Sequence, residues 1–443
     1  MRPFARSALA VFAAAAALAC GPARAQHVTV DAALDHGVFA ADAKTPAWLR
    51  VGLVGHRSAG GGARPTVNVA IVFDKSGSMT GKKIEQAKLA ARAALERLGP
   101  DDIVSVVAYD STVEVLVPAT RVRDRESILR GIDRLRAGGM TALFAGTSKG
   151  AAEIRKFADK TTIDRIILLS DGQANVGPQA PGDLARLGEA LRREKIGVTT
   201  LGLGLDYNED LMVALAQKSG GNHFFVEDPS QLAAMFREGF GGLTSIVAQE
   251  AVVKITFAEG VRPVRALGFD ADILGQTLTA NLAQIYGGSR EDLLVELELS
   301  PQAAGRTQPI ARIAVSYHDA VTQAVDRVET SVGASFASDR GAIEASLQRE
   351  VMALVVERVA QEKSRLAVEL RDQGRVDEAR AVLQKNKAWL DGEAARLRSE
   401  RLRKQAQMND DDARGLDDPA AWNRRRKDMQ FRNNTRDFER VDF

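Results

Sequence analysis

Three separate stretches of the chain carry oxygen-bearing side chains that could hold a metal ion. Asp74, Ser76 and Ser78 stand at alternate positions directly after an apolar run. Thr141 follows a pair of glycines, separated from it by one residue, and Asp171 comes at the end of a second apolar run. Carboxylate and hydroxyl oxygens are hard ligands, and a set with few charges suits Mg²⁺, which keeps several of its waters. These residue types therefore predict a magnesium site if the fold brings the three stretches together.

Two buried strands are expected to position the carboxylates. Each apolar run is continuous, as in strands that are covered on both faces of a sheet. After the first run, apolar residues recur at helical spacing over residues 82–98. Loops that follow the carboxyl ends of central parallel strands line the crevice where open α/β sheets bind ligands. We therefore expect Asp74 and Asp171 to meet at this edge of a sheet.

The combined pattern resembles a known metal site. Asp74-x-Ser76-x-Ser78, together with Thr141 and Asp171, is similar to the metal-ion-dependent adhesion site (MIDAS) of von Willebrand factor type A domains. The expected residue type fills each family position, in the expected order. Asp-x-Ser-x-Ser by itself is also typical of a turn that caps the following helix. The three separated pieces make the pattern far more specific than that.

The resemblance implies a role for each residue. Ser76 and Ser78 would bind the metal directly through their hydroxyls. Thr141 and Asp171 would alternate between direct binding and binding through water, while Asp74 would hold waters and orient the serines. The implied cofactor is Mg²⁺, with Mn²⁺ or Ca²⁺ as possible substitutes. In the family, the vacant coordination position accepts an Asp or Glu carboxylate from a partner protein.

We therefore expect a non-enzymatic, metal-dependent protein-binding or adhesion module of the cell envelope. Two alternatives stay open: a hydrolase that uses the metal to activate water, and a structural scaffold with a vestigial metal site. A hydrolase needs a general base near the metal, and the sequence offers carboxylates but no dedicated base. The histidines are scattered along the chain without metal-ligand spacing.

Residues 1–25 have the pattern of an export signal. A short basic segment precedes an alanine-rich apolar run, and Ala23-Arg24-Ala25 fits a small-x-small cleavage motif. We expect a mature chain that is periplasmic or secreted. The segment that ends in Cys20-Gly21 loosely resembles a bacterial lipobox, so lipidation at Cys20 is the alternative. In that case the protein would be attached to a membrane.

Composition excludes several other classes of protein. Cys20 is the only cysteine, which excludes disulfides and thiolate metal sites in the folded part. The formal net charge is +2, and it falls by three charges to −1 when the export signal with its three arginines is removed. A nearly neutral protein gives no electrostatic argument for nucleic acid as a partner. No other stretch is long and apolar enough to cross a membrane.

The middle of the chain predicts one α/β domain within a β domain. Strand and helix patterns alternate over residues 66–243, which predicts a doubly wound, Rossmann-like sheet covered on both faces. Residues 26–65 and 244–338 show strand patterns that lack a complete apolar face of their own. We expect the two β segments to join in one sandwich, with the α/β domain inserted between them. This layout is similar to that of the inter-α-trypsin-inhibitor heavy-chain group.

The C-terminal part is expected to be helical and then polar. Apolar residues at helical spacing over residues 339–399, interrupted at Gly374, predict a helical hairpin packed on the β domain. Residues 400–443 are polar and carry charges of both signs, which predicts a disordered tail. The alternative is a short segment of arginines and aromatic residues that docks on another protein or on the same fold.

Overall fold

The computed structural model describes residues 26–57, 64–159, 161–243 and 245–434. The predicted export signal, with its alternative lipidation site at Cys20, lies outside these described residues, as does the end of the chain from residue 435. Within the described ranges, no helix combines the length and the apolar character needed to span a membrane.

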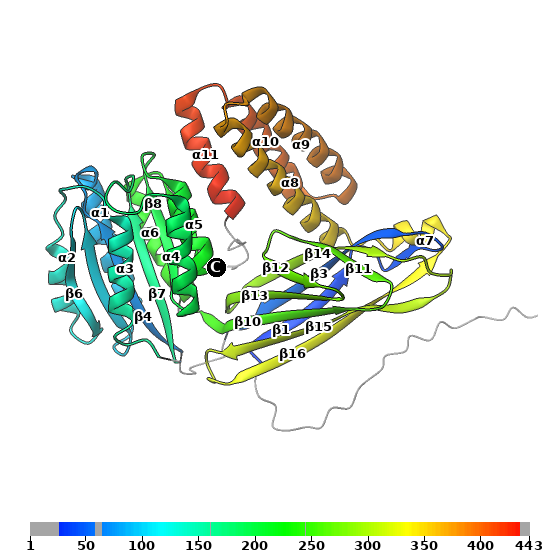
Figure 1. Cartoon of the computed structure of the whole chain (residues 1–443), viewed down its shortest axis with the longest axis horizontal. Coiled ribbons are helices and arrows are strands. Elements are labelled where there is room, and N and C mark those ends of the chain that lie inside the picture. Colours follow the sequence, from blue (N-terminus) through cyan, green and yellow to red (C-terminus); the bar gives the residue numbers. More distant parts are fainter. Residues whose placement is uncertain (1–25, 58–63, 160, 244, 435–443) are drawn as a thin grey trace, which may run out of the picture.

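The α/β domain contains a doubly wound sheet, as the alternating pattern predicted (Figure 1). Its central strands are apolar and buried along almost their whole length, so both faces need covering. One edge strand, Val113–Arg121, runs antiparallel to its neighbour, and all other neighbouring strands of the sheet run parallel to each other. The order across the sheet is β6 (Val113–Arg121), β5 (Ile103–Tyr109), β4 (Thr66–Asp74), β7 (Thr162–Ser170), β8 (Gly197–Leu203) and β9 (His223–Val226).

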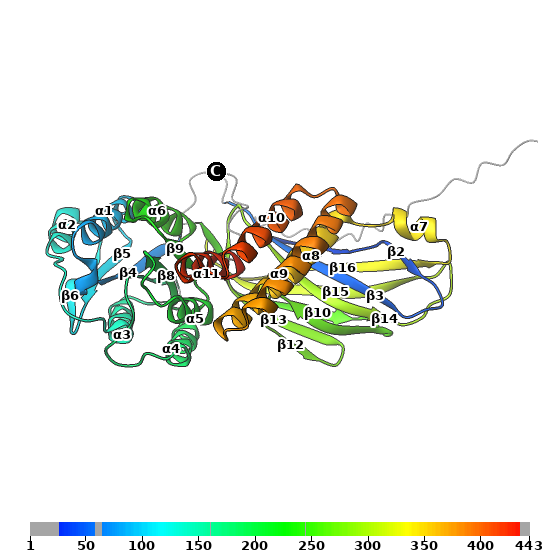
Figure 2. The same cartoon turned by 90° about the horizontal axis from the view of Figure 1, so that it is seen from above.

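Helices cover both faces of this sheet (Figure 2). Alternate residues of each strand belong to two different apolar clusters, because successive side chains point to opposite faces. One face is covered by α1 (Lys82–Glu96), α2 (Arg125–Asp133) and α6 (Leu232–Leu243). The other is covered by α3 (Leu143–Ile154), α4 (Pro181–Arg193) and α5 (Glu209–Ser219). Short 3₁₀ turns, η1 (Gly77–Met79) and η2 (Pro229–Gln231), complete the domain.

The two β segments form one sandwich, so the α/β domain is inserted in it as expected. Strands from before and after the insertion are neighbours in both sheets. The first sheet has the order β1 (Val28–Leu34), β3 (Thr45–Gly55), β14 (Arg290–Leu299), β11 (Val261–Leu267). The second has the order β12 (Ala271–Leu274), β13 (Thr277–Tyr286), β10 (Ile246–Phe257), β15 (Thr307–Asp319), β16 (Val325–Ala337), β2 (Val38–Ala40).

The predicted helical hairpin is present. After the short helix α7 (Arg340–Ala345), α8 (Arg349–Asp372) and α9 (Val376–Leu397) pack against each other, and Gly374 takes a φ of 79° between them. A residue in this left-handed region ends a helix readily when it is glycine. Leu354 and Val355 of α8 pack on the sandwich through Leu267 and Leu294.

The prediction of a disordered tail was wrong for most of its length. Residues 400–434 form two further helices, α10 (Glu400–Arg414) and α11 (Pro419–Asn434). Several apolar residues of this segment are buried against α8 and α9, among them Leu402, Leu416, Trp422 and Met429. The high charge content suggested solvation, but in the structure many of these charges are paired with residues far away in the sequence.

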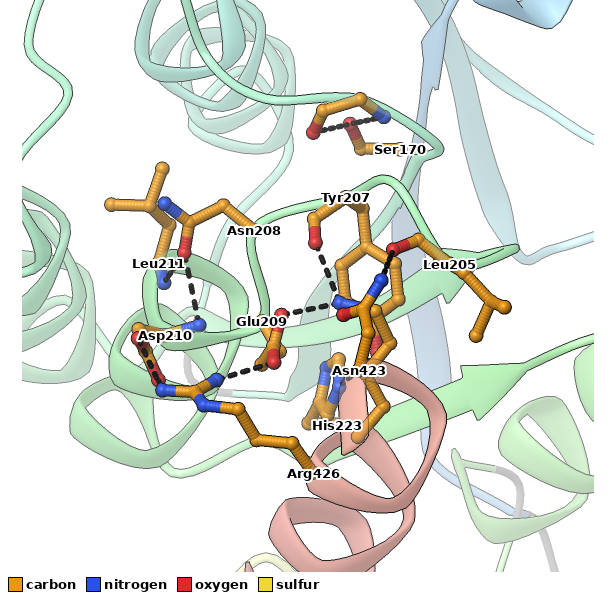
Figure 3. Close-up of polar contacts among 12 residues, drawn as sticks. Ser170, Leu205, Tyr207, Asn208, Glu209, Asp210, Leu211, His223, Asn423 and Arg426 are labelled. Carbon is orange, nitrogen blue, oxygen red and sulfur yellow. Dashed lines mark hydrogen bonds and ion pairs between the residues drawn. The ribbon is translucent and has the colours of Figure 1, made fainter. Parts of the chain in front are cut away.

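Helix α11 docks on the α/β domain, which was the alternative interpretation of this segment (Figures 1 and 3). Arg426 pairs with Glu209 and Asp210 at the start of α5, and Asn423 Nδ2 donates to the carbonyl of Leu205 at 2.9 Å. The Phe431 ring lies 6.3 Å from the ring of Phe224 in β9. The contact therefore combines ion pairs with an aromatic contact and ties the last described helix to the loop after β8.

Candidate metal centre

Asp74 is the last residue of β4, and its side chain is completely buried. Its Oδ1 accepts a hydrogen bond from the backbone N–H of Ser76 at 2.8 Å, and its Oδ2 accepts one from Ser170 Oγ at 2.7 Å. Burial raises the pKa of Asp74 to about 6, although these hydrogen bonds oppose the shift. A cation next to such a carboxylate would favour its charged form and relieve the destabilisation that burial causes.

Ser76 and Ser78 bring two hydroxyls beside the carboxylates. Their Oγ atoms are 3.0 Å apart, and Ser78 Oγ donates to Oδ1 of Asp171 at 2.7 Å. This contact follows from the sheet, because β4 and β7 are adjacent parallel strands whose carboxyl ends lie at the same edge. The Asp74 and Asp171 loops therefore meet there, as the sequence predicted.

Thr141 reaches the same point from a third loop. A β carbon built on Gly172 would lie 3.4 Å from Ser78 Oγ and 3.6 Å from Thr141 Oγ1, so both hydroxyls face the same side of that glycine. The backbone N–H of Thr141 donates to Asn175 Oδ1 at 2.7 Å, which fixes the loop. All the side chains predicted to form the site are therefore close together.

The loop before Thr141 is tied to the loop after β4 by backbone hydrogen bonds. The N–H of Gly77 donates to the carbonyl of Gly139 at 3.0 Å, and the N–H of Gly138 donates to the carbonyl of Lys75 at 2.7 Å. Gly139 has a φ of 78°, a conformation that side chains disfavour. The glycine pair therefore allows the close approach of two loops.

The gathered donors fit a hard divalent cation. They comprise two buried carboxylates and three hydroxyls, with neither sulfur nor nitrogen among them. Zinc and copper sites normally use imidazole or thiolate, and the described residues contain no cluster of three or more His, Cys, Asp or Glu that could hold a metal. The chemistry of the donors therefore matches Mg²⁺ better than a softer metal.

Residues 68–238 match the family model of the von Willebrand factor type A domain. The chain contains a von Willebrand factor type A (VWA) domain. The predicted resemblance to von Willebrand factor type A domains is thereby confirmed for the domain, and the MIDAS assignment stays a prediction. VWA domains often mediate protein interactions and often bind a divalent cation at the MIDAS motif.

Relatives and solved structures support the same assignment. An uncharacterized protein of Synechocystis is 33% identical over 183 residues, which are 41% of this chain and 43% of that protein. Inter-alpha-trypsin inhibitor heavy chain H3 of Bos taurus is 29% identical over 35% of this chain and 18% of its own length. The chain thus spans less than half the length of these curated relatives.

The likeness to a solved structure extends beyond the VWA domain. The structure of "von Willebrand factor type A from Catenulispora acidiphila" has a TM-score of 0.68 and covers 87% of this chain and 90% of its own. Its sequence identity of 19% means that the comparison shows a shared fold alone.

Two residues that contact the candidate metal site of the VWA domain (the VWA site) were not predicted from the sequence. Ser170 donates to Asp74, and its signal was its place next to Asp171 at the end of a buried strand. Lys83 in the first turn of α1 forms an ion pair with Oδ2 of Asp171. The sequence signal for Lys83 was a lysine in the first turn of a helix, where the helix dipole favours a negative charge. Neither residue belongs to the motif pattern.

Tyr109 supports the VWA site from within the domain. It is fully buried at the end of β5, and its hydroxyl donates to the carbonyl of Leu169 at 3.3 Å. Gly146 of α3 lies against its ring, because a β carbon there would be only 2.4 Å from Tyr109 Cδ1. Helix α3 follows Thr141 almost directly, so this packing also affects the third loop of the site.

We expect Gly146→Ala to lower the free energy of unfolding by about 2 kcal/mol, because the added methyl overpacks the buried ring. Urea unfolding of purified protein measures the change. Gly392→Ala is the matched control: Gly392 is exposed in α9 with no atom within 4 Å of an added β carbon. That variant should gain about 0.5–1 kcal/mol. Equal effects at both positions would contradict the packing argument.

Proposed function

We propose that this VWA domain is a divalent-cation-dependent protein-binding module of the cell envelope. Its cation would be Mg²⁺, with Mn²⁺ or Ca²⁺ as substitutes, held by Asp74, Ser76, Ser78, Thr141 and Asp171. The observation that carries the proposal is the convergence of these oxygen-bearing side chains from three loops at one edge of the sheet.

The residues around the cation would position it and leave it open to a partner. A bound cation would supply an electrophilic position for an Asp or Glu carboxylate of a partner protein. Asp74 is fixed by Ser76 and Ser170, so it can orient the hydroxyls instead of moving with the cation. Ligands that are mostly neutral hydroxyls leave the cation with much of its charge.

A binding role fits the site better than hydrolysis. Both carboxylates are assigned to the cation, and Asp74 also accepts two hydrogen bonds while Asp171 contacts Ser78 and Lys83, so neither remains as a dedicated general base. His223 in β9 is buried between Thr200 Oγ1 and the hydroxyl of Tyr207, at 2.9 and 3.1 Å. Burial lowers the pKa of His223 to about 3, so it stays neutral. We therefore propose a non-enzymatic protein.

Location is part of the same proposal. The pattern of residues 1–25 supports export, with a periplasmic or secreted mature protein that begins at Gln26. If Cys20 is lipidated instead, the protein would be anchored at a membrane surface and present the VWA domain from there.

Removal of the metal tests the proposal. Isothermal titration of the mature protein with Mg²⁺ and Mn²⁺ should give saturable binding at a single site. In a pull-down from envelope extract, partners should be recovered with Mg²⁺, lost in EDTA, and recovered again when Mg²⁺ is added in excess. Ser76→Ala provides the matched bait, because it removes one hydroxyl of the site. If the titrations show no metal binding, only the alternative of a structural scaffold with a vestigial metal site remains. Recovery of the same partners in EDTA would exclude recognition through the metal.

A further inference from the structure

Lys83 brings a positive charge to the edge of the proposed cation site. It is the second residue of α1, and its Nζ forms an ion pair with Oδ2 of Asp171. Asp171 is completely buried, whereas 25% of the Lys83 side chain is exposed. The ammonium therefore contacts a buried carboxylate on one side and can be reached from solvent on the other.

The stability of the helix does not explain a lysine at this position. The first turn of a helix favours negative charge, because its free N–H groups and the helix dipole are positive there. Helix α1 nevertheless begins with Lys82 and Lys83, and Gly81 before them provides no side-chain cap. Local preferences are broken most often where a residue serves a function. The contact with Asp171 offers such a function.

The balance of charge around the site gives Lys83 a specific role. The charges of Asp74 and Asp171 together match one divalent cation, so the loaded site would be neutral without a further group. Lys75 is also nearby, but its Nζ is paired with Asp110 Oδ2 at 2.7 Å and its charge is balanced. Among the residues that the structure describes, Lys83 pairs with no acid other than Asp171, which the cation also uses. One net positive charge therefore remains at Lys83 when the cation is bound.

We propose that Lys83 is a partner-binding residue of the VWA site. Its ammonium attracts the carboxylate of the partner toward the cation and, by repulsion, weakens the hold of the site on the cation itself. This inference rests on the function proposed above and adds the group that makes the loaded site selective for anions. Removal of the charge should therefore change the two affinities in opposite directions, whereas a merely structural role would lower both.

Mn²⁺ is a suitable probe, because water molecules that exchange on bound Mn²⁺ raise the relaxation rate of the solvent protons, and this rate can be measured. Wild-type protein, Lys83→Met and Lys83→Arg are first titrated with Mn²⁺, and the loaded proteins are then titrated with acetate and glutarate, which displace water from the metal. We expect Lys83→Met to bind Mn²⁺ about fivefold more tightly and the carboxylates about fivefold more weakly, as for the loss of one exposed charge interaction. Lys83→Arg should stay within about twofold of wild type in both titrations.

Lys75→Met combined with Asp110→Asn is the matched control, since it removes a lysine of the adjoining loop together with the acid that balances it and leaves the net charge unchanged. Both of its affinities should stay close to wild type. If Lys83→Met binds Mn²⁺ and carboxylates as wild type does, or if loaded wild type binds neither acetate nor glutarate, the inference is overturned while the metal site stands. If wild type does not bind Mn²⁺, the proposed function fails first. Circular dichroism of each variant verifies that it is folded.

Discussion

Glu209→Ala is expected to lower the free energy of unfolding by about 3 kcal/mol, because it leaves a buried ammonium without its counter-charge. The side chain of Lys427 in α11 is 2% exposed. Its Nζ pairs with Glu209, donates to the carbonyl of Tyr207 at 2.8 Å and lies 4.3 Å from the centre of the Tyr207 ring. Arg426 pairs with the other oxygen of Glu209. The substitution therefore removes the acid that two cations of α11 share.

Urea unfolding at neutral pH measures this loss, and a double variant separates the pair from the packing. Glu209→Gln combined with Lys427→Met removes both charges while keeping their volumes, so most of the stability should return. Asp210→Ala is the matched single control: Asp210 is 45% exposed, and its pair with Arg426 should contribute at most about 1 kcal/mol. A loss as small as this for Glu209→Ala would show that α11 is not held by the buried pair.

The same contact has a predictable dependence on pH. Burial alone would raise the pKa of Glu209, but the charges of Lys427 and Arg426 outweigh it and lower the pKa below the ordinary value of 4.5. The charged form of Glu209 is therefore stabilised by folding. This contribution is complete above the ordinary pKa of glutamate and is lost as the pH falls through the lowered pKa in the folded state.

Asp74→Asn is expected to stabilise the metal-free protein and to weaken its binding of metal. Burial raises the pKa of Asp74 from 3.8 to about 6, which means that the charged form destabilises the fold above pH 6. Asparagine keeps the shape and can still accept from Ser76. It should raise the free energy of unfolding by about 3 kcal/mol near pH 8. The affinity for Mg²⁺ should fall by about 100-fold.

Two measurements check these opposite effects. Unfolding of the metal-free wild type should become more difficult as the pH falls from about 6 to about 4, because the raised pKa belongs to an acid, and Asp74→Asn should lack this part of the slope. Titration with Mg²⁺ above pH 6 should then show binding by Asp74→Asn about 100-fold weaker than binding by wild type. Asp164→Asn is the control for the pH effect, since burial also raises the pKa of Asp164 to about 6 far from the metal loops. A stabilised Asp74→Asn variant that still binds Mg²⁺ normally would contradict the role of Asp74.

Much of the fold followed from local patterns in the sequence. Continuous apolar runs such as residues 67–73 can be covered only by helices on both faces, so the doubly wound sheet was predictable. The incomplete apolar faces of the two outer β segments likewise predicted their union in one sandwich. The residues of the candidate site were predicted from their types and spacing, and the structure places Asp74 and Asp171 at the ends of neighbouring parallel strands, where the sheet brings them together. Their role as metal ligands stays a prediction.

Only the tertiary structure decided how the charged residues are used. Arg426 and Lys427 belong to a charged run whose composition predicts exposure to solvent. In the structure both pair with Glu209, more than two hundred residues earlier in the chain. Lys83 belongs to no motif, and its contact with Asp171 depends on how α1 packs on the sheet. Apolar periodicity is a local property that the sequence displays directly. The energy of a charge depends instead on burial and on its partner, and both are set by distant segments that meet only in the folded protein.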